Sequence, residues 1–274
     1  MKRSKTASIV LNGVLLVCSL ATILPFLWML ASSLKTNREI STLAQSFLPQ
    51  APTVENYANA LQKMNFLRYF GNSLLYAVSL TVITVYTSAI AGFVLCKYRF
   101  RGRQLLFGAI LATMMVPGVV TIIPRYSIMQ AVGWLDTWKS LLVPGLFTSF
   151  GIFMMRQSCM GIPDEMLEAA RIDGGNEFYI FHRIALPMLR NAVSSIAIFQ
   201  FLWAWEDYLW PYLMMRSQNK QVLSVALNMF SGRYSTDYAG LFAATAIAII
   251  PVVICYLFFQ RRFIEGIASA AVKG

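Results

Sequence analysis

The chain has 274 residues, of which 57% are hydrophobic and 13% charged, and its mean hydropathy is +0.59. Soluble domains carry about 45–50% apolar and about 25% charged residues, so this composition excludes a water-soluble globule, and its apolar content also excludes disorder. The formal charge of +11 does not indicate nucleic-acid binding, because the basic residues concentrate between apolar runs, where the positive-inside bias and anionic lipid account for them. We therefore expect a membrane protein whose partners include lipid but no nucleic acid.

Charge-free apolar runs of about 20 residues predict transmembrane helices and exclude a β-barrel. Two shorter runs could each be re-entrant by length, but their flanking residues favour spanning. We expect an all-α integral membrane protein, with a single transmembrane domain over residues 1–274 and six transmembrane helices; four or five is the alternative. The expected spans are about 8–34, 70–96, 104–128, 139–157, 191–213 and 238–260.

The distribution of basic residues predicts the orientation. With six spans the two termini share one side, and that side holds 14 of the 23 Lys and Arg residues, so both termini are expected in the cytoplasm. The first apolar run follows a basic start but is too long for a signal peptide and lacks a small-residue cleavage site, which predicts a retained signal anchor. Pro117, Pro124 and Pro144 make the third and fourth spans candidates for broken helices.

The segment 158–190 is a polar cytoplasmic loop that holds five of the twelve acidic residues. Pro163 and the acids after it predict a helix over Asp164 to Ile172, and Gly174 suits a left-handed cap at its end. A second amphipathic stretch then runs to Pro187. From periodicity alone, a hairpin lying on the membrane and a docking site for a partner protein are equally good interpretations.

The residue pattern of this loop favours the docking site. Glu168-Ala169-Ala170, three residues, Gly174, nine residues, Ile184, one residue and Leu186-Pro187 resemble the EAA loop of ABC importer permeases. The resemblance implies the type I importer permease fold and a loop that is seated in a cleft of an ATPase subunit. The coupling residues that it implies are Glu168, Ala169, Ala170, Asp173, Gly174, Ile184, Leu186 and Pro187.

Two further segments resemble the carbohydrate-uptake permeases of the maltose-permease type. They are the tail 263–274 and the segment 205–211, where Glu206 stands at a position that is commonly Asn in that family, and Ala270 departs from a common Gly in the tail. The resemblance implies a bacterial inner-membrane importer of a sugar or oligosaccharide. Its implied partners are a second permease, an ATPase dimer that binds ATP and Mg, and an extracytoplasmic solute-binding protein.

The chain lacks the motifs of an enzyme or a motor. It has no Gly-Lys-Ser or Gly-Lys-Thr, so no P-loop can hold ATP phosphates and another subunit must supply the energy. Its single histidine, His182, lies in the polar loop, and Cys159 has no base at a recognisable spacing. The four cysteines show no zinc-finger or redox spacing. We expect no catalytic site, and no cofactor or metal held by this chain.

Two acids and three tryptophans are the candidates for the solute pathway. Glu206 and Asp207 fall near the far edge of the hydrocarbon, where ionisable groups are costly and mark functional sites unless they cap a helix end. Because Pro211 follows them, the preceding turn can open and these acids can accept freed backbone donors or face a water-filled cavity. Trp203, Trp205 and Trp210 suit sugar rings, although such clusters are also typical of interfacial belts.

Three other functions stay open. An importer of glycerol phosphate or a charged saccharide would need basic groups in the cavity, but Arg125 and Arg216 look interfacial and Glu206 would repel an anion, so a neutral glycan is favoured. A secondary transporter would work without an ATPase. A membrane-anchored scaffold would carry no solute flux.

Overall fold

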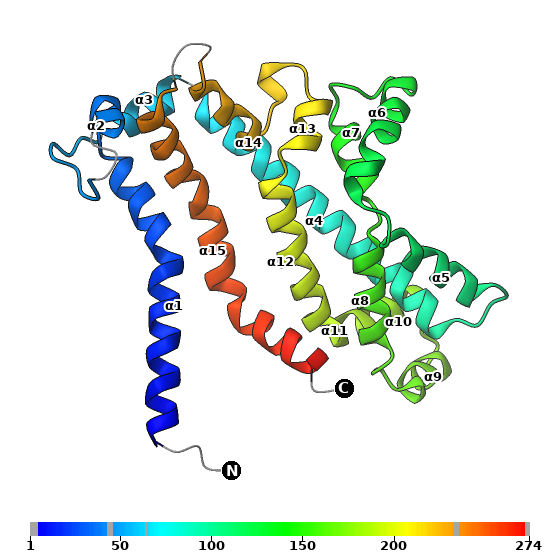
Figure 1. Ribbon diagram of the computed structural model, residues 1–274. Coiled ribbons are helices and arrows are strands. Elements are labelled where there is room, and N and C mark those ends of the chain that lie inside the picture. Colours follow the sequence, from blue (N-terminus) through cyan, green and yellow to red (C-terminus); the bar gives the residue numbers. More distant parts are fainter. Residues whose placement is uncertain (1–4, 43–45, 64, 233–235, 272–274) are drawn as a thin grey trace. The chain divides into compact units, whose positions relative to one another are not determined.

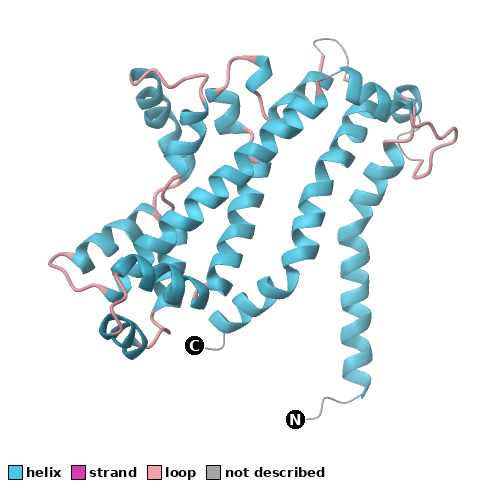
Figure 2. Ribbon diagram, turned by 180° about the vertical axis from the view of Figure 1, so that it is seen from behind, coloured by secondary structure: helices cyan, strands magenta, loops and turns pink. Residues whose placement is uncertain are grey.

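The computed structural model describes residues 5–42, 46–63, 65–232 and 236–271. These residues form helices and loops, with no strand among them (Figure 2). The contacts divide the chain into two compact units, residues 1–67 with 226–250 and residues 68–225 with 251–274. The ends of the chain, and with them the last three residues of the tail that resembles sugar permeases, lie outside the described residues.

The first unit contains the first long helix and part of the last one. Asn56 donates from Nδ2 to the carbonyls of Ser33 and Lys35, 2.8 Å each, and so closes the carboxyl end of the first helix. Trp28 meets Phe242 edge to face, with ring centroids 5.4 Å apart. The elements of this unit are α1 (Lys5–Ser32), α2 (Asn37–Thr42), α3 (Glu55–Lys63), η5 (Leu227–Phe230) and the first part of α15 (Tyr238–Ala271).

The second unit carries every candidate site residue. It is built around α4 (Phe66–Lys97), against which shorter helices pack (Figure 1). After α4 come α5 (Arg103–Thr113), η1 (Gly118–Thr121), α6 (Ile122–Ala131), α7 (Trp138–Leu142), η2 (Val143–Gly145), α8 (Ser149–Cys159), α9 (Asp164–Ile172), α10 (Glu177–Ile180), the π-helical η3 (Phe181–Ala185), α11 (Leu186–Met188), α12 (Arg190–Glu206), α13 (Leu209–Met214), η4 (Gln218–Lys220) and α14 (Leu223–Ala226).

Small residues let α4 and α8 approach closely. A Cβ added at Gly92 would lie 2.5 Å from the Met155 Cβ and 2.7 Å from the Arg156 backbone nitrogen, and one at Gly151 would lie 2.4 Å from the Ser88 Oγ. Without a hydrophobic driving force between helices in lipid, close backbone approach of this kind supplies the packing energy. The α4–α8 crossing, here called the α4–α8 frame, is therefore closely packed, and its Met155 lies in a buried core with Leu167 and Ile180.

The predicted spans are found in part. Within the described residues, four helices are long and apolar enough to cross a membrane: Val10–Ser32, Phe66–Lys97, Trp138–Cys159 and Tyr238–Phe258. They lie close to four of the expected ranges. The third expected span is a broken helix, as its prolines predict, since α5 and the η1–α6 segment meet at 96°. A second bent pair, Glu177–Met188 with α12, turns by 78°. The count is four, or up to six if each bent pair is one span, so six stays a prediction.

Proline and freed carbonyls account for the breaks. Pro117 lies directly before η1, and Pro144 lies in η2, as a broken-helix reading of these two prolines predicts; Pro124 is instead accommodated in the first turn of α6. Thr84 donates to the Gly145 carbonyl at 2.7 Å, and Thr87 donates to the carbonyl of Leu146. Hydroxyls of α4 thus satisfy backbone groups that the broken helix leaves unpaired.

Candidate functional site

Residues 164–188, here called the polar hairpin, begin with a helix that matches its predicted bounds, Asp164–Ile172. Its end is a Schellman turn: the Gly175 N–H donates to the Ala170 carbonyl at 2.8 Å and the Gly174 N–H to the Arg171 carbonyl at 3.0 Å. Gly174 has φ +86°, a conformation that side chains with a Cβ disfavour. The predicted left-handed glycine cap is therefore confirmed.

The second half of the polar hairpin is one helical run of changing pitch. The Asn176 Oδ1 accepts from the Tyr179 N–H at 2.8 Å and caps α10. The π-helical turn Phe181–Ala185 follows, and α11 carries Pro187 in its first turn. A π turn loosens the backbone where proline cannot donate, so the run continues through Pro187 to Met188.

The eight predicted coupling residues fall into buried, half-buried and exposed positions. Ala170 packs with Leu167 in the hydrophobic core beside Ile180 and Phe181, so it is not available to a partner. The reason is periodicity, because Ala170 lies three residues after Leu167 on the inner face of α9. Half-buried positions are Ile184 and Leu186, and exposed positions are Glu168, Ala169, Asp173, Gly174 and Pro187. Two apolar side chains that the prediction left out are also exposed, Ile172 at 86% and Phe178 at 70%.

Two residues at the end of α4 hold the polar hairpin. Lys97, whose side chain is 8% exposed, donates from Nζ to the Ile162 carbonyl and to the Asp164 Oδ1, 2.5 Å each. This hydrogen bond and charge hold the pKa of Asp164 below its usual range. The Tyr98 hydroxyl donates a hydrogen bond to the Glu177 carboxylate, which also accepts one from the Arg171 Nε at 2.9 Å. Sequence patterns did not reveal this role of Lys97 and Tyr98, because both partners lie more than 60 positions away in the chain.

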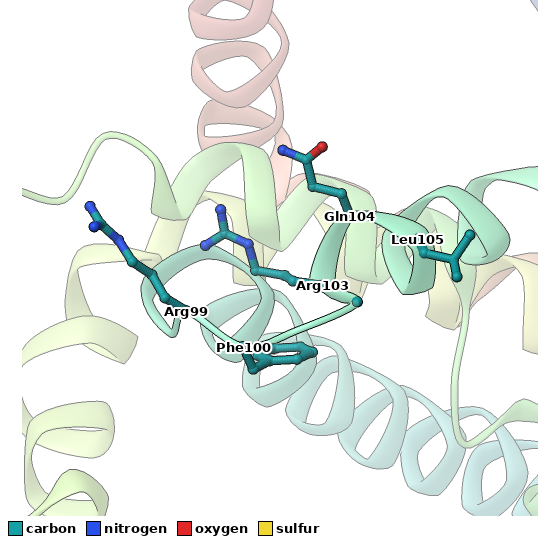
Figure 3. A pocket seen from close by; sticks show the side chains of 6 residues that line it. Arg99, Phe100, Arg103, Gln104 and Leu105 are labelled. Carbon is teal, nitrogen blue, oxygen red and sulfur yellow. The ribbon is translucent and has the colours of Figure 1, made fainter.

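The loop after Tyr98 is basic and closes the carboxyl end of α4. Arg103 donates from Nη1 to the carbonyls of Cys96 and Tyr98, at 3.3 and 3.1 Å, which satisfies groups that a helix end leaves open. Figure 3 shows Arg99 and Arg103 beside a pocket of about 280 Å³ that Phe100 and Leu105 also line. Arg103 thus stabilises the end of α4, on which the polar hairpin is anchored.

The turn between α12 and α13 opens as the position of Pro211 predicts. The helix stops at Glu206, and α13 starts at Leu209. Asp207 accepts the Trp210 N–H at 3.4 Å through Oδ1 and the Tyr76 hydroxyl at 3.0 Å through Oδ2. Asp207 therefore serves both as a helix cap and as a polar contact to α4.

The five predicted pathway residues separate into two groups. Trp203 is 52% exposed and lies against Phe150 and Phe199, Trp205 is buried, and Glu206 is exposed. Only Asp207 and Trp210 line a common cavity. Because successive positions on a helix point in different directions, the cluster does not face one cavity.

This cavity, here called the α4–α13 cavity, has a volume of about 390 Å³. Trp210 is fixed in its wall, since its Nε1 donates to the Ser140 carbonyl at 3.0 Å. The Arg125 guanidinium lies over the Trp210 ring, 4.3 Å from its centroid. Arg125, which the sequence suggests to be interfacial, thus lines this cavity. The lining residues are Tyr76, Leu80, Gly118, Val119, Ile122, Arg125, Leu141, Gly145, Asp207, Leu209 and Trp210.

A polar cluster around Asp136, here called the Asp136 clasp, joins two loops. Asp136 has φ +57° and accepts from the Ser217 N–H and Oγ, at 3.0 and 2.6 Å, and from the Lys220 Nζ at 3.0 Å. Burial disfavours its charge, but the hydrogen bonds from Ser217, Lys220 and Arg216 outweigh this and hold the pKa of Asp136 well below its usual range. The clasp connects the α6–α7 turn to the segment after α13.

No group of three or more His, Cys, Asp or Glu side chains that could hold a metal ion occurs within the described residues.

Residues 85–269 match the family described as the binding-protein-dependent transport system inner membrane component. The chain belongs to this family. This permease is a multi-pass transport subunit of the inner membrane rather than an enzyme.

Relatives of known annotation share nearly the whole length of this permease. It is 32% identical to the arabinooligosaccharides transport system permease protein AraQ of Bacillus subtilis, over 94% of this chain and 93% of that protein. It is 32% identical to the diacetylchitobiose uptake system permease protein NgcG of Streptomyces coelicolor, over 96% and 88%. It is 28% identical to the lactose transport system permease protein LacG of Rhizobium radiobacter, over 98% and 97%.

One solved structure has the same fold. A chain of a bacterial ABC transporter involved in the import of the acidic polysaccharide alginate superposes with a TM-score of 0.85, at 24% identity, over 96% of this permease and 99% of that chain. The predicted importer permease fold is confirmed.

Proposed function

We propose that this permease is one of two transmembrane subunits of an ATP-driven importer that moves a sugar or oligosaccharide into the bacterial cytoplasm by alternating access. The observation that carries the proposal is the polar hairpin, which presents Glu168 and Ala169 on an exposed edge and is anchored to α4 through Lys97. A rigid hairpin of this kind can transmit the movement of a docked subunit to a membrane helix.

The partners follow from the same proposal. A separate ATPase dimer binds ATP and Mg and receives the polar hairpin, a second permease completes the pathway, and an extracytoplasmic binding protein delivers the solute. Dependence on a binding protein is supported by the family description. A sugar solute is supported by the names of the relatives AraQ, NgcG and LacG.

The orientation places both termini and the polar hairpin in the cytoplasm. The hairpin adjoins the basic loop with Arg99 and Arg103, and the positive-inside rule assigns such loops to the cytoplasm. Single cysteines at positions 46 and 273 in a cysteine-free chain test this. An impermeant maleimide added to spheroplasts should label position 46 only; labelling of position 273 would contradict the orientation.

The importer assignment is tested in a reconstituted complex of the two permeases, the ATPase and the binding protein. Glu168→Lys should reduce ATP-dependent sugar uptake at least about tenfold, because it reverses a charge on the docking edge. Glu165→Lys is the matched control, since Glu165 is exposed on the same helix but outside the EAA pattern. Full uptake by Glu168→Lys, or uptake by this chain in vesicles without any ATPase, would reject the assignment, the latter in favour of a secondary transporter.

A second candidate solute is glycerol phosphate or a charged saccharide. The placement of Arg125 in the α4–α13 cavity favours it, because a guanidinium binds carboxylate and phosphate well. Competition of glycerol 3-phosphate or an acidic disaccharide with labelled sugar in the same assay would distinguish the two.

A further inference from the structure

The α4–α13 cavity combines one cation and one anion that do not pair with each other. In the part of the chain that the structure describes, no hydrogen bond or ion pair engages the Arg125 guanidinium, which instead stacks on Trp210 at 4.3 Å. Stacking covers the face of a guanidinium and leaves its N–H edges free to donate. A partly buried guanidinium whose N–H groups make no hydrogen bond is costly, so these edges are suited to a bound polar molecule.

Asp207 supplies the complementary acceptor. Its carboxylate receives the Tyr76 hydroxyl at 3.0 Å and the Trp210 N–H at a longer 3.4 Å. An ionised carboxylate has about four acceptor positions, so it keeps capacity for further donors. The contact with Tyr76 fixes its orientation against α4.

The remainder of the wall is apolar. Leu80, Val119, Ile122, Leu141 and Leu209 line the cavity together with two glycines. The volume of about 390 Å³ lies within the range of about 300–1,000 Å³ that is typical of small-molecule sites, which combine apolar walls with a few placed polar groups. Trp210 itself offers no free face for stacking on the Arg125 side, so it serves as a platform for the cation.

We propose that Arg125 and Asp207 form a solute subsite in this subunit that takes one neutral sugar ring, Arg125 donating to and Asp207 accepting from neighbouring hydroxyls. Each hydroxyl both donates and accepts, and the C–H faces of the ring contact the apolar wall. The charges of Arg125 and Asp207 sum to zero, which suits a neutral ring, whereas the Asp207 carboxylate would repel a carboxylate or phosphate ester. The inference rests on the proposed import of a sugar and adds that this subunit contacts it.

The test uses the full reconstituted importer with saturating binding protein, and labelled lactose, diacetylchitobiose and arabinotriose as probes. Arg125→Gln and Asp207→Asn should each lower the maximal rate of uptake about tenfold or more, the effect of losing a hydrogen bond to a charged group. The half-saturating concentration of binding protein should not change. Glu206→Gln, the adjacent exposed acid outside the cavity lining, should transport like the wild type.

The outcomes separate the two proposals. Wild-type rates in both Arg125→Gln and Asp207→Asn, with the sugar still imported, would overturn the subsite and leave the importer standing. Absence of ATP-dependent uptake of all three probes by the wild-type complex would overturn both. Arg125→Lys serves as a second variant, in case Arg125→Gln fails to assemble. It keeps the charge but loses the planar stack and fork, and it should lower uptake while the yield of assembled complex equals that of the wild type. Full uptake by Arg125→Lys would contradict the proposed geometry.

Discussion

The polar hairpin and the α4–α13 cavity lie in one compact unit. Helix α12 connects them, because it begins just after the hairpin and ends just before Asp207 of the cavity wall. The hairpin takes its shape from near neighbours: Arg171 pairs with Glu177 six residues away, and its turn closes on Gly174. The cavity instead joins groups from distant helices, as with Tyr76 and Asp207, 131 positions apart. A region shaped locally tolerates changes elsewhere, whereas a region assembled from distant helices depends on the frame that holds them.

Breaking the α4–α8 frame should have the largest effect, because Met155 lies in a buried core of the unit that carries both regions. Gly92→Leu places a side chain where a Cβ already lies 2.5 Å from the Met155 Cβ, and overpacking of this kind costs about 1–3 kcal/mol or more. We expect a clear drop in the melting temperature of the purified complex and loss of uptake. Gly71→Leu on the same helix is the control, because nothing lies within 4 Å of its Cβ position. Equal melting temperatures for the two variants would contradict the α4–α8 frame.

Changing the glycine turn should damage only the polar hairpin. Gly174→Val forces a β-branched side chain to φ +86°, which costs about 1–2 kcal/mol. We expect roughly a tenfold loss of ATP-coupled uptake with an unchanged amount of assembled permease pair, measured by transport and co-purification. Gly174→Asn, which tolerates the left-handed region, should keep most of the activity; if Asn and Val behave alike, backbone conformation is not the cause.

Releasing the hairpin from α4 should uncouple the two regions. Lys97→Met removes both contacts of the Lys97 Nζ, to Ile162 and Asp164. Since Asp164 is largely exposed, we expect only a small loss of stability but a several-fold fall in sugar moved per ATP hydrolysed. Lys97→Arg should restore much of this ratio. An unchanged ratio in Lys97→Met would show that the anchor transmits no movement.

The Asp136 clasp should have the smallest effect and little pH dependence. The folded-state pKa of Asp136 is lowered, so its stabilisation is complete above the ordinary value near 3.8 and is lost only as the pH falls through the lowered pKa. The backbone amides of residues 216–220 should therefore show equal protection from hydrogen exchange at pH 5 and pH 8. Asparagine tolerates the same backbone angle, so Asp136→Asn tests the charge alone. It should speed exchange roughly fivefold at both pH values, which corresponds to a loss of about 1 kcal/mol in local stability. Protection that falls between pH 8 and pH 5 would contradict this assignment.

Local chemistry explains why part of the site could be predicted. The bounds of α9, the left-handed Gly174 and the open turn before Pro211 all depend on residues within one or two helical turns. Ala170 shows the limit, because its place in the EAA pattern does not reveal that it packs inward against Ile180.

By itself the sequence determined the membrane class, the four long apolar helices and the turn of the polar hairpin, since hydropathy and backbone preferences act over short distances. Only the tertiary structure decided that α5 and α6 meet at 96°, that Arg125 stacks on Trp210 and that Lys97 holds Asp164. The last two contacts join segments far apart in the chain, which local backbone preferences and hydropathy do not bring together.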